Sequence, residues 1–148
     1  MWLKIGVLIS VIVLFSGCSE EKERSKPVKT EKEKAYDIPW EKDLESAFKK
    51  AKKEHKKIII MAVSKHCKWC NKIKEETLSD PKILKKLNNY LLVKIDRETP
   101  TQREQVPKFE HVPVFFFATA EKKFYDELTG YFTTKEFLAA LKEVEELE

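Results

Sequence analysis

The feature that most constrains this chain is a pair of cysteines, Cys67 and Cys70, that stands between two segments of different pattern. The preceding segment, Ile58–Val63, is an unbroken apolar run rich in strand formers, which predicts a buried strand. The segment that follows has helical spacing as far as about Leu78. Two cysteines separated by two residues, at the exit of a strand and in the first turn of a helix, are typical of a redox pair.

The expected position of the pair also predicts which cysteine reacts. A helix N-terminus carries unpaired N–H groups and a partial positive charge, which favour the thiolate, the reactive species, at Cys67. Cys70 lies one turn further in, where we expect desolvation to disfavour the thiolate. Further positive charge near the pair comes from Lys65, Lys68, Lys72 and, as an additional candidate, His66.

Two other interpretations of the cysteine pair stay open. A structural zinc site needs four ligands, whereas the chain has one CxxC motif. The remaining candidate ligands are Cys18, which is far away in the chain, His66, which is adjacent to Cys67, and His55 and His111, which lie on unrelated elements. A purely structural disulfide would close too short a loop to stabilise the fold much. Redox chemistry is therefore the favoured interpretation.

The composition narrows the function classes. At 148 residues there is room for one domain and its appendages. Charged residues make up 36% of the chain, and the two signs nearly balance at a net charge of +4. Such a balance indicates a solvated surface and argues against a nucleic-acid partner. We expect a monomer.

The first seventeen residues predict a targeting segment. Lys4 precedes an uncharged, mostly apolar run, Ile5–Phe15, which is too short to span a bilayer as a helix. The small residues Ser16 and Gly17 then precede Cys18. This arrangement resembles a bacterial lipoprotein signal, apart from Phe15 in place of the usual Leu. The resemblance implies cleavage after residue 17 and a lipid on Cys18; the alternative is an ordinary secretory peptide followed by a stray cysteine.

Residues 18–35 predict a flexible tether behind the lipidated cysteine. They are highly charged and show no apolar periodicity, so they cannot bury enough surface to offset the entropy of ordering. A flexible segment of this length reaches about 20–25 Å. We expect it to hold a folded domain, residues 36–148, at the bacterial cell envelope, facing the periplasm or the cell exterior. A solvated helix is the alternative for this segment.

The domain shows an alternating pattern of helices and strands. A strand, a helical segment and a second strand imply a parallel crossover, and two strands joined by a short turn imply an antiparallel hairpin. We therefore expect an α/β fold with a four-stranded mixed sheet flanked by helices. The expected strands are Ile58–Val63, Tyr90–Ile95, Val114–Ala118 and Phe124–Leu128. The expected helices start after Asp43, at the cysteine pair, after Asp80, and after Thr133 or Thr134.

This order, with CxxC after the first core strand and Val112-Pro113 before the hairpin, resembles the thioredoxin fold over essentially all of residues 36–148. The segment Thr77–Pro81 is similar to the one found in the C-terminal periplasmic domain of the transmembrane thiol:disulfide interchange reductase. It is also similar to thioredoxins of sulfur oxidation and cytochrome c maturation. The resemblance implies that Cys67 is the exposed nucleophile, that Cys70 is the buried resolving cysteine, and that Pro113 follows a cis peptide bond.

The resemblance also implies a substrate-binding surface around the pair. Val112 would offer backbone groups to a bound peptide, and the neighbouring positions His66, Lys68 and Trp69 would line the contact. One departure from the family concerns proton transfer: Met61 stands where many thioredoxins hold a buried acid. We therefore expect slower release of the mixed disulfide, or water as the proton acceptor.

The implied activity is thiol–disulfide exchange on protein substrates, in the reducing direction, with a membrane electron donor or acceptor as partner and with no cofactor or metal. Two alternatives come from other classes. One is a delivery module that binds Cu(I) or another soft ion through Cys67, Cys70 and a histidine. The other is a binding or chaperone-like domain with a vestigial disulfide.

Overall fold

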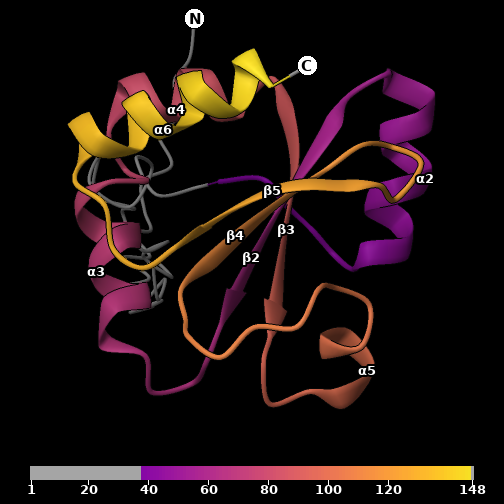
Figure 1. The fold of residues 1–148 in the computed structure, drawn as a ribbon, viewed down its shortest axis with the longest axis horizontal. Coiled ribbons are helices and arrows are strands. Elements are labelled where there is room, and N and C mark those ends of the chain that lie inside the picture. The colour runs from indigo at the N-terminus through magenta and orange to yellow at the C-terminus, as the bar shows by residue number, and fades with distance from the viewer. Residues whose placement is uncertain (1–37, 148) are drawn as a thin grey trace, which may run out of the picture.

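The computed structural model describes residues 38–147, which form one mixed sheet with helices on both faces (Figure 1). The predicted leader, Cys18 and the whole of the predicted tether lie outside the described residues. In chain order the elements are β1 (Trp40–Glu41), α2 (Leu44–Glu54), β2 (Lys57–Val63), α3 (Lys68–Glu76), α4 (Pro81–Leu87), β3 (Tyr90–Asp96), α5 (Pro100–Arg103), β4 (Val114–Ala118), β5 (Phe124–Thr129) and α6 (Thr134–Glu146).

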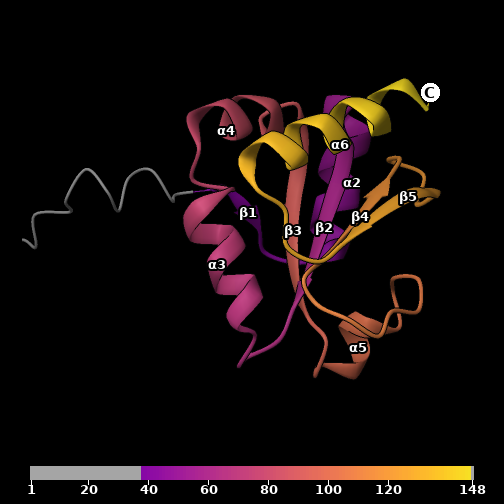
Figure 2. The same cartoon turned by 60° about the vertical axis from the view of Figure 1, so that its left-hand side comes forward.

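The sheet has the strand order β1-β3-β2-β4-β5, with β2 at its centre (Figure 2). β2 pairs in parallel with β3 and antiparallel with β4, and β4 and β5 form the predicted antiparallel hairpin. The α/β class and the mixed sheet are confirmed. The expected number of four strands is wrong by one, because Trp40 and Glu41 pair in parallel with Leu92 and Val93 and so add a two-residue edge strand.

The central strand is buried on both faces, which explains its unbroken apolar run. Alternate residues of β2 belong to two separate hydrophobic clusters. Ile59 and Met61 pack with α3, α4 and α6 on one face, and Ile58 and Ile60 pack with α2 and with the segment before β4 on the other. Figure 1 shows these two groups of helices on opposite sides of the sheet.

Short capping motifs define where the helices begin. The Asp43 carboxylate accepts a hydrogen bond from Ser46 N–H at 2.7 Å, and Asp80 accepts one from Lys82 N–H at 2.8 Å, as predicted for these two caps. The last helix is capped by Thr133, which resolves the choice between Thr133 and Thr134. The segment after β3 contains the short helix α5, whose N-cap residue, Thr99, makes no side-chain capping hydrogen bond.

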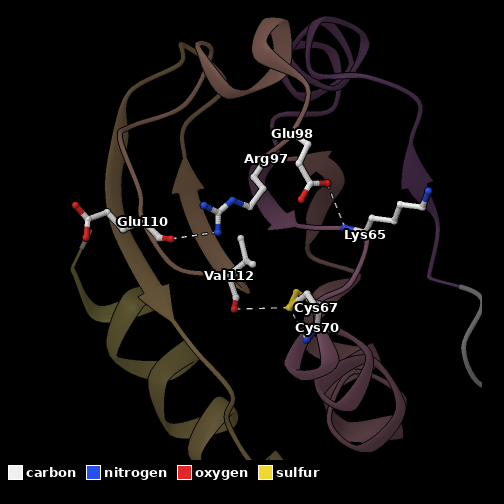
Figure 3. Close-up of a disulfide and its surroundings, with 7 residues drawn as sticks. All are labelled: Lys65, Cys67, Cys70, Arg97, Glu98, Glu110 and Val112. Atoms are coloured by element: carbon white, nitrogen blue, oxygen red, sulfur yellow. Dashed lines mark hydrogen bonds between the residues drawn. A yellow bond between two sulfur atoms is a disulfide. The ribbon is translucent and has the colours of Figure 1, made fainter.

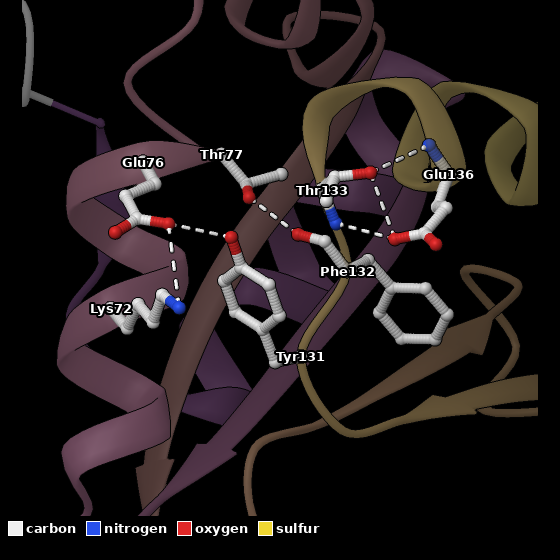
Figure 4. Close-up of polar contacts among 7 residues, drawn as sticks. All are labelled: Lys72, Glu76, Thr77, Tyr131, Phe132, Thr133 and Glu136. Carbon is white, nitrogen blue, oxygen red and sulfur yellow. Dashed lines mark hydrogen bonds and ion pairs between the residues drawn. The ribbon is translucent and has the colours of Figure 1, made fainter.

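The end of α3 is tied to the start of α6. The side chain of Thr77, which is fully buried, donates a hydrogen bond to the Phe132 carbonyl at 2.5 Å (Figure 4). This bond joins residues 55 positions apart in the chain and sets the position of the segment that leads into α6. Among residues 38–147, no helix is long and apolar enough to cross a bilayer.

Candidate active site

The two cysteines form a disulfide at the junction of β2 and α3 (Figure 3). Their sulfur atoms are 2.10 Å apart and their Cα atoms 5.2 Å apart. Cys67 is the N-cap of α3, with extended backbone angles, and Cys70 lies in the first turn. The predicted placement at the exit of a strand and the start of a helix is therefore correct.

The two sulfur atoms have different surroundings. The Sγ of Cys67 accepts a hydrogen bond from the Cys70 backbone N–H at 3.0 Å, in the manner of an N-capping side chain. Cys67 is half-buried, whereas Cys70 is only 2% exposed and packs in the hydrophobic cluster beneath α3. After reduction, the same N–H group and the helix N-terminus would stabilise a thiolate at Cys67, while burial would disfavour one at Cys70.

The segment directly before β4, the strand next to β2, also lies beside the disulfide. The Val112–Pro113 peptide bond is cis, as the resemblance implied. The Val112 carbonyl oxygen lies 3.7 Å from Cys67 Sγ (Figure 3), and the Pro113 carbonyl accepts a hydrogen bond from Gly130 N–H at 2.8 Å. The fold thus brings a backbone carbonyl 45 positions along the chain next to the accessible sulfur.

The loops beside the site are connected by two further hydrogen bonds. The backbone N–H of Lys65 donates to the carboxylate of Glu98 at 3.4 Å, and the Arg97 guanidinium donates to the Glu110 carbonyl at 3.2 Å (Figure 3). Neither Glu98 nor Arg97 belonged to the predicted site. Both residues follow β3. The parallel pairing of β2 and β3 places them at the same end of the sheet as the cysteines, which follow β2.

The remaining predicted contact residues are exposed beside the disulfide. His66 and Lys68 flank Cys67 on the surface, and Trp69 is 56% exposed. Met61 is fully buried in the hydrophobic cluster that contains Cys70. A methionine in that place offers no group that could accept a proton from Cys70, which agrees with the departure noted in the sequence.

Sequence reasoning missed Tyr131, which lies next to Trp69 with ring centroids 5.6 Å apart. The Tyr131 hydroxyl donates to Glu76 at 2.6 Å, and this hydrogen bond raises the pKa of Tyr131 above its usual value of 10.0. The one available signal was its place after Gly130. Across residues 38–147, no group of three or more His, Cys, Asp or Glu side chains lies close enough together to hold a metal ion.

The model of the family described as thioredoxin-like domain matches residues 44–145, which is more than half of the chain and includes both cysteines. The chain belongs to the thioredoxin-like domain family. This membership confirms the predicted family, and the bonded CxxC pair makes this thioredoxin-like protein a thiol:disulfide oxidoreductase by type.

Solved structures share the fold of this thioredoxin-like protein. A thioredoxin from Thermus thermophilus is 23% identical with a TM-score of 0.59, over 69% of this chain and 83% of that one. The oxidised C-terminal domain of DsbD from Neisseria meningitidis is 18% identical with a TM-score of 0.56, over 67% and 90%. The periplasmic thioredoxin SoxS from Paracoccus pantotrophus is 13% identical with a TM-score of 0.51, over 62% and 98%.

Two curated relatives resemble part of the chain. Spermatogenesis-associated protein 20 of Mus musculus and of Rattus norvegicus are each 39% identical over 61 residues, which is 40% of this chain. The matched part amounts to 7% of the length of those proteins. The similarity therefore concerns a segment within a much larger protein.

Proposed function

We propose that this protein is a membrane-tethered, extracytoplasmic thiol:disulfide oxidoreductase that reduces protein disulfides through Cys67 and Cys70. The observation that carries the proposal is the asymmetry of the pair. The Cys67 sulfur is accessible and accepts a hydrogen bond of 3.0 Å from a backbone N–H at a helix N-terminus, whereas Cys70 is almost completely buried. A nucleophile and a resolving thiol need these two environments.

The reaction would proceed in two exchanges. The Cys67 thiolate attacks one sulfur of a substrate disulfide, and the substrate S–S bond breaks as the mixed disulfide forms. The departing substrate thiolate takes up a proton. Cys70 then loses its proton to water, because Met61 offers no acceptor, and attacks the Sγ of Cys67. The second substrate thiol leaves, so the substrate gains two electrons and the Cys67–Cys70 disulfide is restored.

The neighbours of the pair would hold the substrate during these steps. A bound segment could pair with the backbone of Val112, whose carbonyl already lies 3.7 Å from Cys67 Sγ. Pro113 keeps that backbone turned toward the sulfur. His66, Lys68 and Trp69 are exposed beside the pair and are the side chains that a substrate would meet.

We assign the reducing direction from the resemblance to the C-terminal domain of the interchange reductase. A continuous reductase needs a dithiol electron donor in the membrane to return the pair to its reduced form. The capping N–H bond to Cys67 would itself stabilise the reduced form and make the disulfide more oxidising. A measured potential therefore tests the direction separately from the reaction.

The domain organisation belongs to the same proposal. Residues 1–17 would be removed, Cys18 would carry lipid, residues 18–35 would form the tether, and residues 36–148 would face the periplasm or the exterior of a bacterial cell. Disulfide chemistry is favoured in such compartments. Support also comes from the similarity in fold to SoxS, which is described as a periplasmic thioredoxin.

The test is substrate trapping in cells with Cys70→Ala, which removes the resolving thiol. We expect mixed disulfides between Cys67 and exported proteins, which appear on non-reducing gels and disappear on reduction. The double variant Cys67→Ser/Cys70→Ala is the matched control and should trap none. Absence of trapped proteins would contradict the proposal, and a soft metal ion purified in stoichiometric amount would point to the metal-delivery alternative.

A further inference from the structure

A cluster of four side chains lies beside the disulfide on the exposed surface of α3. We call Trp69, Lys72, Glu76 and Tyr131 the Trp69 cluster. The Lys72 ammonium lies 5.3 Å from the ring centroid of Trp69 and 4.7 Å from that of Tyr131. Three members come from α3, and Tyr131 comes from the segment before α6.

Contacts within the cluster hold the rings in place. The Glu76 carboxylate accepts a hydrogen bond of 2.6 Å from the Tyr131 hydroxyl and also forms an ion pair with Lys72 at 3.9 Å (Figure 4). Tyr131 in turn contacts Trp69. An aromatic ring that is already positioned loses little side-chain entropy when a partner covers it, and such rings are common at the energetic centres of interfaces.

The exposure of Trp69 is unusual for this molecule. Among the large hydrophobic side chains of residues 38–147, only Trp69 and Leu147 are exposed, at 56% and 66%. Leu147 lies just beyond the last helix, whereas Trp69 is the residue immediately before Cys70. A partner that covers Trp69 therefore also approaches the reacting sulfur atoms.

The surface around Trp69 is positively charged. From Ser64 to Lys74 the chain has four lysines and no acidic residue. Three carboxylates lie nearby: Glu98 contacts the Lys65 backbone, Glu76 is bonded to Tyr131 and Lys72, and Glu75 follows Lys74 on α3. A partner with acidic side chains around an apolar one would complement this arrangement of charge.

We propose that the Trp69 cluster selects the substrate: it binds a protein segment that has an apolar side chain next to its reacting cysteine and acidic residues beyond it. This inference rests on the proposed function and adds to it the class of substrate. The apolar side chain would cover the Trp69 indole. The acidic residues would lie against Lys68 and Lys72.

The test uses three synthetic peptides, each closed by one disulfide. The first has Leu and two Glu beside one cysteine, the second replaces both Glu by Lys, and the third replaces Leu by Ser. The full chain is purified in detergent, reduced with a dithiol, and its rate constant for each peptide is measured. The rate with 2-hydroxyethyl disulfide, a small neutral compound, serves as the reference for the reactivity of Cys67 itself.

We expect the first peptide to react about tenfold faster than the Ser peptide, as is typical of a buried aromatic contact. We expect it to react about threefold faster than the Lys peptide at low salt, and this second preference should shrink as salt screens the charges. Trp69→Ala should abolish the preference for Leu, and Trp69→Phe should restore part of it. Replacing Lys68 and Lys72 by Gln should abolish the preference for Glu.

Matched controls separate the cluster from general surface effects. Leu147→Ala removes the other exposed hydrophobic side chain, and the double variant Lys52→Gln/Lys53→Gln removes the same charge from α2, on the opposite face of the sheet. Neither should change the preferences. Equal rates of the wild type for all three peptides would overturn this inference and leave the proposed function standing. Failure to reduce even 2-hydroxyethyl disulfide would overturn both.

Discussion

Cys67 and Cys70 lie at the start of α3 but differ in their access to solvent. Cys67 precedes the helix, and its sulfur accepts a hydrogen bond of 3.0 Å from the Cys70 backbone N–H, whereas the side chain of Cys70 points into the core. The difference follows from position, because Cys67 lies at the end of the helix, whereas Cys70 lies within it on the side that packs in the hydrophobic core. The reactivity of the two thiols should differ accordingly.

We predict that alkylation of the reduced protein near neutral pH modifies Cys67 before Cys70. The thiolate is favoured at the helix N-terminus and disfavoured in the buried position. Mass mapping of the labelled peptides measures the order directly, and Cys67→Ser and Cys70→Ala give the rate of each thiol alone. Equal labelling of both, or faster labelling of Cys70, would reverse the assignment of nucleophile and resolving cysteine.

Gly130 is the single glycine after residue 17, and its backbone explains why it is there. Its φ of +104° lies in a region that side-chain-bearing residues rarely adopt. A Cβ atom built at this position meets nothing within 4 Å, so steric contact is not the reason. The conformation matters because the Gly130 N–H bonds to the carbonyl of Pro113, beside the active site.

We predict that Gly130→Ala lowers the free energy of unfolding by about 1–2 kcal/mol, the cost of forcing an L-residue into this backbone conformation. Chemical denaturation of the two proteins measures it. Thr129→Ala, at the neighbouring exposed position, is the control and should change stability by a few tenths of a kcal/mol at most. An unchanged midpoint for Gly130→Ala would refute the backbone argument.

The start of α6 is stabilised by a reciprocal capping box. The Glu136 carboxylate accepts hydrogen bonds of 2.8 Å from both the backbone N–H and the hydroxyl of Thr133. In return, the Thr133 hydroxyl oxygen accepts a hydrogen bond of 3.4 Å from the Glu136 backbone N–H. The hydrogen bond from the Thr133 backbone N–H, followed by the one from its hydroxyl, holds the pKa of Glu136 below its ordinary value of 4.5. The motif matters for the site because α6 follows directly after Tyr131 and Phe132.

We predict that Thr133→Ala lowers stability by about 1 kcal/mol, the usual effect of losing an N-cap. Glu136→Gln should also destabilise the protein at neutral pH. Because the folded pKa of Glu136 is lowered, its contribution is complete above pH 4.5 and is lost as pH falls through the folded value. The difference between wild type and Glu136→Gln should therefore vanish in acid.

Denaturation curves at several pH values measure this dependence on Glu136. Glu143→Gln, an exposed carboxylate later in the same helix, is the matched control. The free energy of unfolding of Glu143→Gln should differ from that of wild type by a small amount that stays constant across the same pH range. A pH-independent difference for Glu136→Gln would show that the capping carboxylate does not act through its charge.

At the level of the entire protein, the anchoring of the chain is open to a direct test. We predict that Cys18→Ser releases the domain from membranes while the fold is retained, because the attached lipid supplies the membrane affinity. Cell fractionation and the intact mass measure this, and Cys67→Ser, which also removes one thiol, should stay in the membrane fraction. Soluble wild-type protein without added lipid mass would contradict the prediction.

Local patterns were enough to predict most of the elements. The apolar run of β2, the caps at Asp43 and Asp80 and the cysteine pair are each contained within a few residues, and each produced the expected structure. Such signals are readable because backbone hydrogen bonds in helices, capping and side-chain alternation act over short distances in sequence. The cis bond before Pro113 came from the resemblance instead, since a cis bond is a rare outcome for X–Pro pairs in general.

Contacts between distant segments could be found only in the tertiary structure. The edge strand β1 exists because β3 presents free backbone groups to Trp40 and Glu41, and a two-residue strand has no pattern of its own. Tyr131 reaches Trp69 because the Thr77–Phe132 bond joins α3 to the segment before α6. Its partners lie 55 or more positions away, and the free energy of such contacts depends on the path of the whole chain, which no local window of sequence contains.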